Sequence, residues 1–368
     1  MSIRIKDVKK ILDEWAAPTL AEPWDQIGLF LGDPEQEVRR IKVALGVSPE
    51  VVKEAIDSKA DLLVTHHPLW MSPPMKLSED QPIGKMVADL IRHNIGVLSA
   101  HTNLDACKEG VNDNLANILE LREVTPLIPQ IQSNWLKLAV FVPETDADLL
   151  QNALGDAGAG QFKNYSHCAF STLGEGTFLP LTGAKPAIGE IGKLEKVNEA
   201  RIEAIVNREN LSPVLASMLA AHPYEEVVYD LIPLENQTGG NEGLGRVGNL
   251  QTEMTLGEFA DFVKTKLNLQ GVRFCGELTT KIRKVALCGG SGMSLLKEAL
   301  RSGADVYLTG DIKHHDAEEA LQNGICLVDG GHFGTENHIL SVVVERLQKE
   351  TNCSVDICSG ESEIFKFC

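Results

Sequence analysis

The chain contains two similar blocks of alternating strand and helix patterns, and this internal repeat limits the folds open to it. Residues 42–66 read "KVALGVSPEVVKEAIDSKADLLVTH", and residues 284–310 read "KVALCGGSGMSLLKEALRSGADVYLTG". Each block predicts a strand, a turn, a helix, the pair Ala-Asp and a second apolar strand that runs to a threonine. Residues 90–105 and 320–336 continue the parallel, since each predicts a helix end, a strand, a histidine and a carboxylate four residues later. Matching blocks in the same order indicate a duplication.

The period of the apolar residues in these blocks switches between about 2 and about 3.6, as expected for parallel β-α units. We therefore predict a duplicated three-layer α/β domain with a parallel-rich sheet. Sheets of this kind place their ligands just beyond the carboxyl ends of the strands, so functional residues are expected there.

Residues 133–236 have a different character and predict a separate domain. Their apolar patterns predict the order β-α-β-β-α-β, which is the ferredoxin-like arrangement of an α+β domain. The glycine-rich run "NQTGGNEGLG" at residues 236–245 reads as the linker that leaves this domain. We assign residues 1–132 and 237–368 to the first and second halves of one α/β domain, and residues 133–236 to an inserted domain.

Composition and charge argue against several classes of function. The net charge of −18 disfavours a surface that tracks nucleic-acid phosphates or binds an anionic membrane. Residues 1–15 predict a charged amphipathic helix rather than a signal peptide, and no apolar run is long enough to span a membrane. The eight cysteines form no CxxC pairs, in a chain too long to need disulfide bridges. We expect a soluble cytoplasmic protein.

Histidines and carboxylates gather just past the ends of the predicted strands. Two adjacent histidines follow the strand of "LLVTHHPLW", and a histidine precedes a carboxylate by four residues in both "AHTNLD" and "GGHFGTE". A lone histidine at such a place is usually structural, but three such sites, two of them at matching places of the duplication, favour a metal site. The candidate residues are His66, His67, His101, Asp105, His332 and Glu336.

Adjacent histidines in a turn can each give a nitrogen to a different metal ion. Two neighbouring dications repel each other and need a bridging carboxylate, for which Asp105 and Glu336 are the candidates. If a helix begins near Thr335, Glu336 projects from its first turn and His332 reaches in from the preceding loop. His101 is left open between a metal ligand and a group that orients Asp105.

Two further motifs could contact a substrate. In "TGDIKHHD", His314 and His315 could carry protons or contact a substrate near the rim. The loop "CGGSG" (288–292) resembles a phosphate cradle before a helix, but a tight turn that needs glycine is the favoured interpretation. The basic residues near these motifs are Lys313 and Arg246, which is few for a triphosphate site.

These motifs together resemble a known family, the Nif-three-like dinuclear metal proteins. The resemblance rests on "AEPWDQIGLFLGD", "VTHHPL", "SAHTNLD", "GLGRVG", "CGGSG", "YLTGDIKHHD" and "DGGHFGTE", which occur in this order and cover both halves of the split domain. Bacterial members are commonly labelled GTP cyclohydrolase I type 2 homologues. The insert, with "HPYEEVVYDL", is similar to the CutA-like or PII-like modules of longer bacterial members.

The resemblance implies a site with two divalent metal ions per chain. It implies as ligands His66, His67, Asp105, His332 and Glu336, with Glu336 as the bridge and His101 in a supporting place. Nitrogen and oxygen ligands without thiolate suit zinc first, and also manganese, iron, cobalt or nickel. The resemblance further implies a ring-like homohexamer. One departure is Gly46, where many members carry an acidic residue after the first strand.

Two functions of different classes follow from these features. The first is a metal-dependent hydrolase in which a metal-bridging hydroxide attacks an unidentified small-molecule substrate, with a nucleotide as one candidate. Its proton carriers would be among His101, His314 and His315. The second is a metal-stabilised regulatory or scaffold protein whose PII-like insert senses a small molecule. A ring that encloses nucleic acid is disfavoured by the acidic charge.

Overall fold

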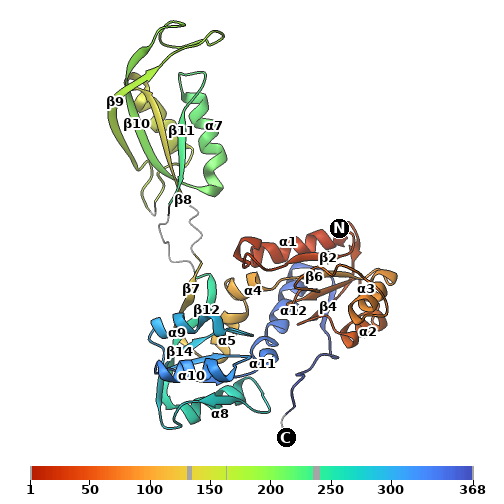
Figure 1. The fold of residues 1–368 in the computed structure, drawn as a ribbon. Helices are drawn as coiled ribbons and strands as arrows, with labels where there is room; N and C mark the ends of the chain where they lie inside the picture. The colour runs from red at the N-terminus through yellow and green to blue at the C-terminus, as the bar shows by residue number, and fades with distance from the viewer. Residues whose placement is uncertain (1, 131–134, 163, 235–240, 367–368) are drawn as a thin grey trace. The chain divides into compact units, whose positions relative to one another are not determined.

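The computed structural model divides the chain into two compact units (Figure 1). The larger unit comprises Met1–Gln130 with Gly240–Cys368, and the smaller unit comprises Ile131–Gly239. Both combine helices with sheets, so the predicted mixed α/β class is confirmed. Within the described residues, no helix has the length and apolar character needed to cross a membrane. The described residues are 2–130, 135–162, 164–234 and 241–366.

The first sheet of the larger unit has four parallel strands and one antiparallel edge strand, the last in the order below. A small antiparallel pair, β1 (Ile3–Arg4) and β3 (Glu37–Val38), forms separately from it. Across the first sheet the strand order is β17 (Ser354–Ile357), β4 (Arg40–Ala44), β5 (Leu62–Thr65), β6 (Gly96–Ser99) and β2 (Gly28–Leu31).

Helices cover both faces of the first sheet, because successive side chains of a strand point to opposite faces. On one face, Leu62 and Val64 pack with residues of α1 (Ile5–Trp15) and α12 (Ile339–Glu350). On the other face, Leu63 packs with residues of α2 (Pro49–Asp57) and α3 (Pro82–Arg92). Helix α1 is the predicted N-terminal amphipathic helix, and it buries its apolar side.

The second sheet repeats the parallel centre of the first but has antiparallel strands on both sides of it. Its parallel strands are β16, β15 and β14 of the order given below. The prediction of a single parallel-rich sheet is therefore corrected, because each repeat block builds a sheet of its own. The strand order is β13 (Arg273–Cys275), β16 (Cys326–Asp329), β15 (Val306–Thr309), β14 (Lys281–Leu287), β12 (Gly243–Thr255) and β7 (Arg122–Pro129).

The second sheet is also covered on both faces. On one face, Val306 and Leu308 pack with residues of α5 (Val111–Ile118) and α8 (Leu256–Lys266). On the other face, Tyr307 packs with residues of α9 (Leu296–Arg301) and α10 (His314–Gln322).

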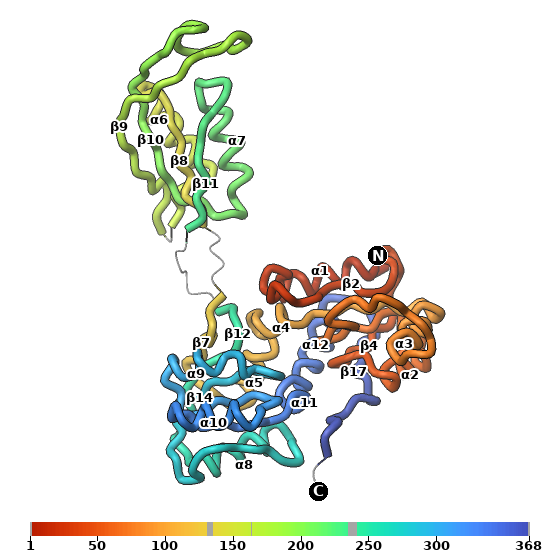
Figure 2. The backbone as a smooth tube through the Cα atoms, in the orientation of Figure 1, coloured from red at the N-terminus to blue at the C-terminus, as the bar shows by residue number. Residues whose placement is uncertain are grey.

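The two sheets exchange segments of the chain. Strand β7 and helix α5 precede the insert in sequence, yet β7 pairs with β12 and Leu115 of α5 packs in the core of the second sheet. Conversely, β17 pairs with β4, and Val343 of α12 packs in the core of the first sheet. Figure 2 shows α5 and β7 among the cyan and blue elements, and the blue α12 beside β4. The halves of the sequence are therefore not the halves of the structure.

The smaller unit has the predicted order β-α-β-β-α-β. All neighbouring strands pair antiparallel, and both helices pack against one face of the sheet. The strand order is β11 (Tyr229–Pro233), β8 (Trp135–Pro143), β10 (Glu195–Asn207) and β9 (Ala169–Phe178), and the helices are α6 (Ala147–Asp156) and α7 (Leu211–Ala221).

The predicted exit linker at residues 236–245 needs a correction at its end. Gly243, Leu244 and Gly245 belong to β12, and Gly243 and Leu244 pair with β7, so this stretch forms part of the second sheet. Residues 236–240 of the predicted linker lie outside the described residues.

Arg246 on β12 is a buried structural residue. Its side chain is 1% exposed and pairs with Asp113 at the start of α5. It also donates hydrogen bonds to the carbonyls of Gly243 and Gly245 at 2.6 and 2.7 Å. Arg246 was a candidate cation for a phosphate group because it lies near the motifs in the sequence. The burial of its side chain contradicts that role.

Replacing Arg246 with methionine should strongly destabilise the larger unit. The substitution leaves Asp113 and several carbonyls without a buried partner, and breaking a buried ion pair costs about 3–5 kcal/mol. Chemical unfolding followed by tryptophan fluorescence measures the loss. The exposed Arg301, which pairs with Glu298, is the control, and Arg301→Met should cost less than about 0.5 kcal/mol. Equal losses in the two variants would contradict the structural role of Arg246.

Candidate metal centre

His66 and His67 stand in the turn directly after β5, as predicted. Their backbone amides donate to the carbonyls of Ala44 and Leu45 at 3.2 and 2.6 Å, so the end of β4 holds the turn. The hydroxyl of Thr65 donates to the carbonyl of His67 at 2.8 Å. The backbone therefore fixes both histidines at the carboxyl edge of the first sheet.

The other candidates lie on two one-turn helices that follow strands of the two sheets. Asp105 lies on α4 (Thr102–Ala106), which follows β6. His332 and Glu336 are the first and last residues of α11 (His332–Glu336), which follows β16. The helix thus begins at His332 and not near Thr335 as predicted. Residues four apart on a helix share a face, so both side chains point to the same place.

The structure brings the five predicted ligands together into two groups that share Glu336. Its Oε1 lies 3.8 Å from Nε2 of His66, and that nitrogen lies 3.7 Å from Oδ1 of Asp105. Its Oε2 lies 2.9 Å from Nε2 of His67 and 3.2 Å from Nε2 of His332. The ligand atoms of each group lie within 4.8 Å of one another, which is close enough to hold one metal ion.

Two polar atoms of the first group are buried without a partner among the described residues. They are Nε2 of His66 and Oδ1 of Asp105. Nδ1 of His66 donates to the carbonyl of Ala100 at 3.0 Å, so Nε2 is the nitrogen that the ring presents to the cluster. Buried polar atoms are nearly always paired, and an atom without a partner needs an explanation. A cation between these two atoms would satisfy both.

The charges of the cluster shift the pKa values of its members. Burial disfavours the charged form of His66, but Asp105 and Glu336 outweigh it and raise its pKa to about 9. A hydrogen bond to Glu336 raises the pKa of His332 to about 9 as well. Burial raises the pKa of Asp105 to about 6, whereas the surrounding histidines overcome burial and hold the pKa of Glu336 well below its usual range. Positive charge is therefore favoured at this place.

Two carboxylates outside the predicted ligand set orient histidines of the cluster. Asp25 accepts a hydrogen bond from Nδ1 of His101 at 2.8 Å, and Asp311 accepts one from Nδ1 of His332 at 2.8 Å. A histidine that binds a metal usually donates its other nitrogen to such a partner. Both aspartates occur in motifs of the sequence, but no local pattern indicates this role because their histidine partners are distant along the chain.

His101 itself lies inside the cluster. One of its nitrogens falls within 4.8 Å of nitrogens of His66 and His67. With Nδ1 engaged by Asp25, Nε2 is the atom that it can offer to the cluster. His101 could therefore serve as a ligand or as a group that moves protons beside the ligands.

His314 and His315 lie apart from the cluster. Their side chains are 81% and 92% exposed at the start of α10, and both pair with Glu318 of the same helix. Neither belongs to the groups that could hold a metal ion among the described residues. Of this motif, only Asp311 reaches the cluster.

The loop "CGGSG" is shaped by the cluster and not by a phosphate. The amides of Gly289, Gly290 and Gly292 donate to side chains of Asn112, Thr335 and Thr309, each at 2.9 Å, so they are already engaged. Gly290 has φ +63°, and a Cβ on it would lie 2.0 Å from Oε1 of Glu336. The glycine is required because the backbone closely approaches this carboxylate.

The carboxyl-terminal segment supplies a carboxylate beside Gly46. The amides of Leu45 and Gly46 donate to Oε2 and Oε1 of Glu361 at 2.6 and 2.8 Å. A Cβ on Gly46 would lie 3.9 Å from Oε1 of Glu361 and 3.5 Å from Nδ1 of His67. At the position where the resemblance leads us to expect an acidic residue, the acidic group comes from the far end of the chain.

A cavity of about 820 Å³ opens beside His332. Its walls include Phe333, Asn268 and Gln270, together with Phe365 of the carboxyl-terminal segment. This mixture of aromatic and amide side chains suits a small organic molecule next to the cluster.

The fold and the cluster define a mixed α/β protein with a buried group of histidines and carboxylates that is compatible with metal binding. A family model described as Duf34/NIF3 (NGG1p interacting factor 3) matches residues 3–363. The chain therefore belongs to this family, which confirms the resemblance drawn from the motifs.

Several bacterial proteins are similar to most of the chain. A "GTP cyclohydrolase 1 type 2 homolog" of Bacillus subtilis (strain 168) is 44% identical over 332 residues, which cover 90% of this chain and 89% of the relative. The crystal structure of a Bacillus cereus protein related to NIF3 matches with a TM-score of 0.82 and 40% identity, and covers 100% of this chain and 99% of that one. Staphylococcus aureus protein SA1388 matches with a TM-score of 0.80, 29% identity and the same coverage.

Replacing Gly290 with alanine should disturb the cluster more than the backbone strain alone explains. An alanine at positive φ costs about 1–2 kcal/mol. The added methyl also overlaps with Glu336, and overpacking costs typically about 1–3 kcal/mol more. Gly303, at φ +70°, is the matched control, since a Cβ there meets nothing within 4 Å. Chemical unfolding of Gly290→Ala and Gly303→Ala measures the difference, and equal losses would contradict the close approach to Glu336.

Proposed function

We propose that the protein holds two divalent metal ions at this cluster and uses them to hydrolyse a small molecule. The observation that carries the proposal is the pair of buried atoms without partners, Nε2 of His66 and Oδ1 of Asp105. Both atoms face the carboxylate of Glu336, which is 5% exposed and whose other oxygen contacts His67. Such an arrangement is costly without a cation to complete it.

The two groups of the cluster would each hold one ion. His66, Asp105 and Oε1 of Glu336 would hold the first, and His67, His332 and Oε2 of Glu336 would hold the second. Paired divalent ions supply hydroxide at neutral pH and polarise a substrate oxygen. The donor set of nitrogen and oxygen suits zinc first, and manganese, iron, cobalt or nickel next.

His101 is the best-placed proton carrier of the three candidates. It lies within the cluster, and Asp25 fixes its ring through Nδ1. His314 and His315 stand at the surface, where they could contact only the outer part of a substrate.

The substrate would occupy the cavity beside His332. The printed name of the B. subtilis relative, a GTP cyclohydrolase 1 type 2 homolog, supports a nucleotide as one candidate. Arg273 and Lys366 line the cavity, but Arg273 pairs with Asp329 and Lys366 donates to the carbonyl of Glu363. Any phosphate group would therefore depend chiefly on the metal ions for its contacts.

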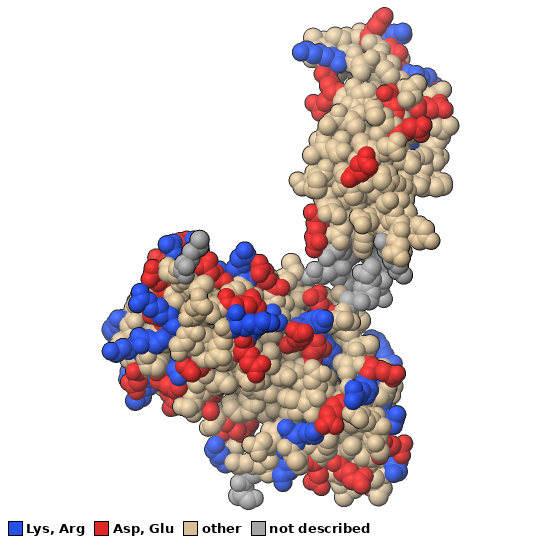
Figure 3. Space-filling model, turned by 180° about the vertical axis from the view of Figure 1, so that it is seen from behind, with Lys and Arg blue, Asp and Glu red and all other residues tan. Residues whose placement is uncertain are grey.

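Assembly and location are part of the proposal. We propose a ring-like homohexamer in the cytoplasm, and light scattering on purified protein tests for a mass of six chains. We do not propose nucleic acid as a partner. On the face seen in Figure 3, basic side chains alternate with acidic ones, and the whole chain carries a net charge of −18.

Elemental analysis of protein purified without added metal or a chelating tag tests the metal centre. We expect about two ions per chain in the wild type and loss of both in the double variant His332→Ala, Glu336→Ala, because Glu336 is shared by the two groups. The double variant His314→Ala, His315→Ala is the control and should keep both ions, since these exposed histidines lie outside the cluster. Wild-type protein that binds no ion even after reconstitution would refute the proposal.

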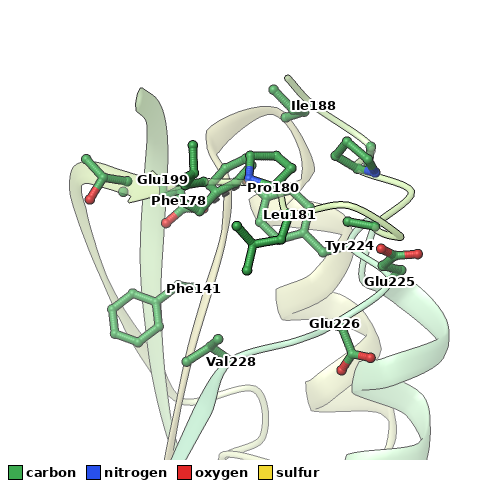
Figure 4. Close-up of a pocket in the computed structure, with 16 residues that line it drawn as sticks. Phe141, Phe178, Pro180, Leu181, Ile188, Glu199, Tyr224, Glu225, Glu226 and Val228 are labelled. Atoms are coloured by element: carbon green, nitrogen blue, oxygen red, sulfur yellow. Dashed lines mark hydrogen bonds between the residues drawn. The ribbon is translucent and has the colours of Figure 1, made fainter. Parts of the chain in front are cut away.

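A second function, regulation through the insert, is favoured by a cavity in the smaller unit. This cavity has a volume of about 480 Å³ and lies under the segment that follows β9 (Figure 4). Phe141, Phe178, Leu181 and Tyr224 give it apolar and aromatic walls. Among the described residues its lining includes three glutamates and no lysine or arginine, so it suits a neutral or cationic molecule with an apolar body better than a nucleotide.

A thermal-shift screen of the full chain against neutral and cationic metabolites tests this second function. A true ligand should raise the melting temperature of the wild type but not of Phe178→Ala, which removes a wall of the cavity. Phe170→Ala is the matched control on the same strand, since Phe170 is exposed and does not line the cavity. The absence of any stabilising compound while both metal ions remain bound would count against a sensing role.

A further inference from the structure

The segment after β17 is held against helix α2. The amides of Ser359 and Gly360 donate to Oε2 of Glu54 at 2.8 and 2.9 Å. Glu54 lies on α2 and also accepts a hydrogen bond from Lys42 of β4 at 3.1 Å. These bonds direct the segment past the end of β4, which is the strand next to the one that carries His66 and His67.

Glu361 then binds the turn that follows β4. Its two carboxylate oxygens accept the amides of Leu45 and Gly46, two consecutive residues, at 2.6 and 2.8 Å. A carboxylate that accepts two backbone amides makes strong charge-assisted hydrogen bonds and fixes the turn in one conformation.

The same turn also contacts His67. The carbonyl of Leu45 accepts the amide of His67 at 2.6 Å. Gly46 faces the imidazole ring, since a Cβ on Gly46 would lie 3.5 Å from Nδ1 of His67. Glu361 and His67 therefore both contact the same two-residue turn.

His67 depends on this turn more than the other histidines of the cluster do. Nδ1 of His66, His101 and His332 each bond to an oxygen, of Ala100, Asp25 and Asp311 respectively. For Nδ1 of His67 no such partner is seen within the described part of the chain, and its hydrogen bonds run through Nε2 to Glu336 and His332. Apart from these contacts inside the cluster, packing and the backbone set the direction of this ring.

We propose that Glu361 is a positioning residue of the metal centre, which fixes the Leu45–Gly46 turn and thereby aims the ring of His67. The inference rests on the proposed two-metal function. Because His66 has its own anchor in the Ala100 carbonyl, loss of Glu361 weakens the ion held by His67 and His332 and spares the ion held by His66 and Asp105. Loss of a residue that orients a ligand typically lowers metal affinity about 10–100-fold.

Zinc titration of full-length apo-protein, in competition with a coloured chelator, tests the inference. In Glu361→Ala, one zinc ion per chain should bind about 10–100-fold more weakly and the other within about twofold of the wild type. Glu50→Ala is the matched control: Glu50 is an exposed carboxylate in the first turn of α2, near the same turn, and should leave both affinities unchanged. Cobalt substitution gives a second readout, in which only one of the two ligand-field spectra should change.

Each outcome is decisive. Equal weakening of both ions in Glu361→Ala, or no weakening of either, overturns the positioning role. Wild-type protein that binds no zinc removes the proposed function itself, and the inference with it. If Glu361→Ala does not fold, Glu361→Gln retains one acceptor oxygen and should show the same selective loss at smaller size.

Discussion

The contact between Glu336 and the histidines around it is the interaction on which the rest of the larger unit depends. Glu336 comes from the second half of the chain, and its two oxygens face His66 and His67 from the first half. A buried carboxylate costs several kcal/mol unless charged partners compensate it. The two sheets must therefore keep one relative arrangement, because a shift between them would remove His66 and His67 and leave only His332 of its own helix beside this charge.

The exchange of segments between the sheets makes that arrangement stable. Strand β7 and helix α5 belong to the second sheet, and α12 and β17 belong to the first, so each sheet is completed by the other half of the sequence. Arg246 adds a buried connection between β12 and Asp113 of α5. The site thus forms between two cores that cannot separate without losing their own helices and strands.

The cluster is rigid because most of its side chains are held from behind. Three of its histidines have an oxygen at the nitrogen that points away from the cluster, and Gly290 lets the backbone approach Glu336 from the remaining side. Preorganised ligands spend little free energy on ordering when an ion binds. A large cavity lies directly beside this rigid group, so a substrate would meet an assembled site.

The sequence by itself determined the local elements and the ligand candidates. Apolar periods predicted α1, β5 and the order of elements in the insert, and strand ends marked His66 and His67, because these features depend on neighbouring residues alone. Tertiary structure decided the rest. It formed two sheets where the sequence predicts one, and it made Gly243–Gly245 part of a strand that pairs with β7. It buried Arg246, brought Asp25 to His101 and brought Glu361 to the turn after β4. Those outcomes rest on contacts between residues far apart in the chain, which no local pattern records.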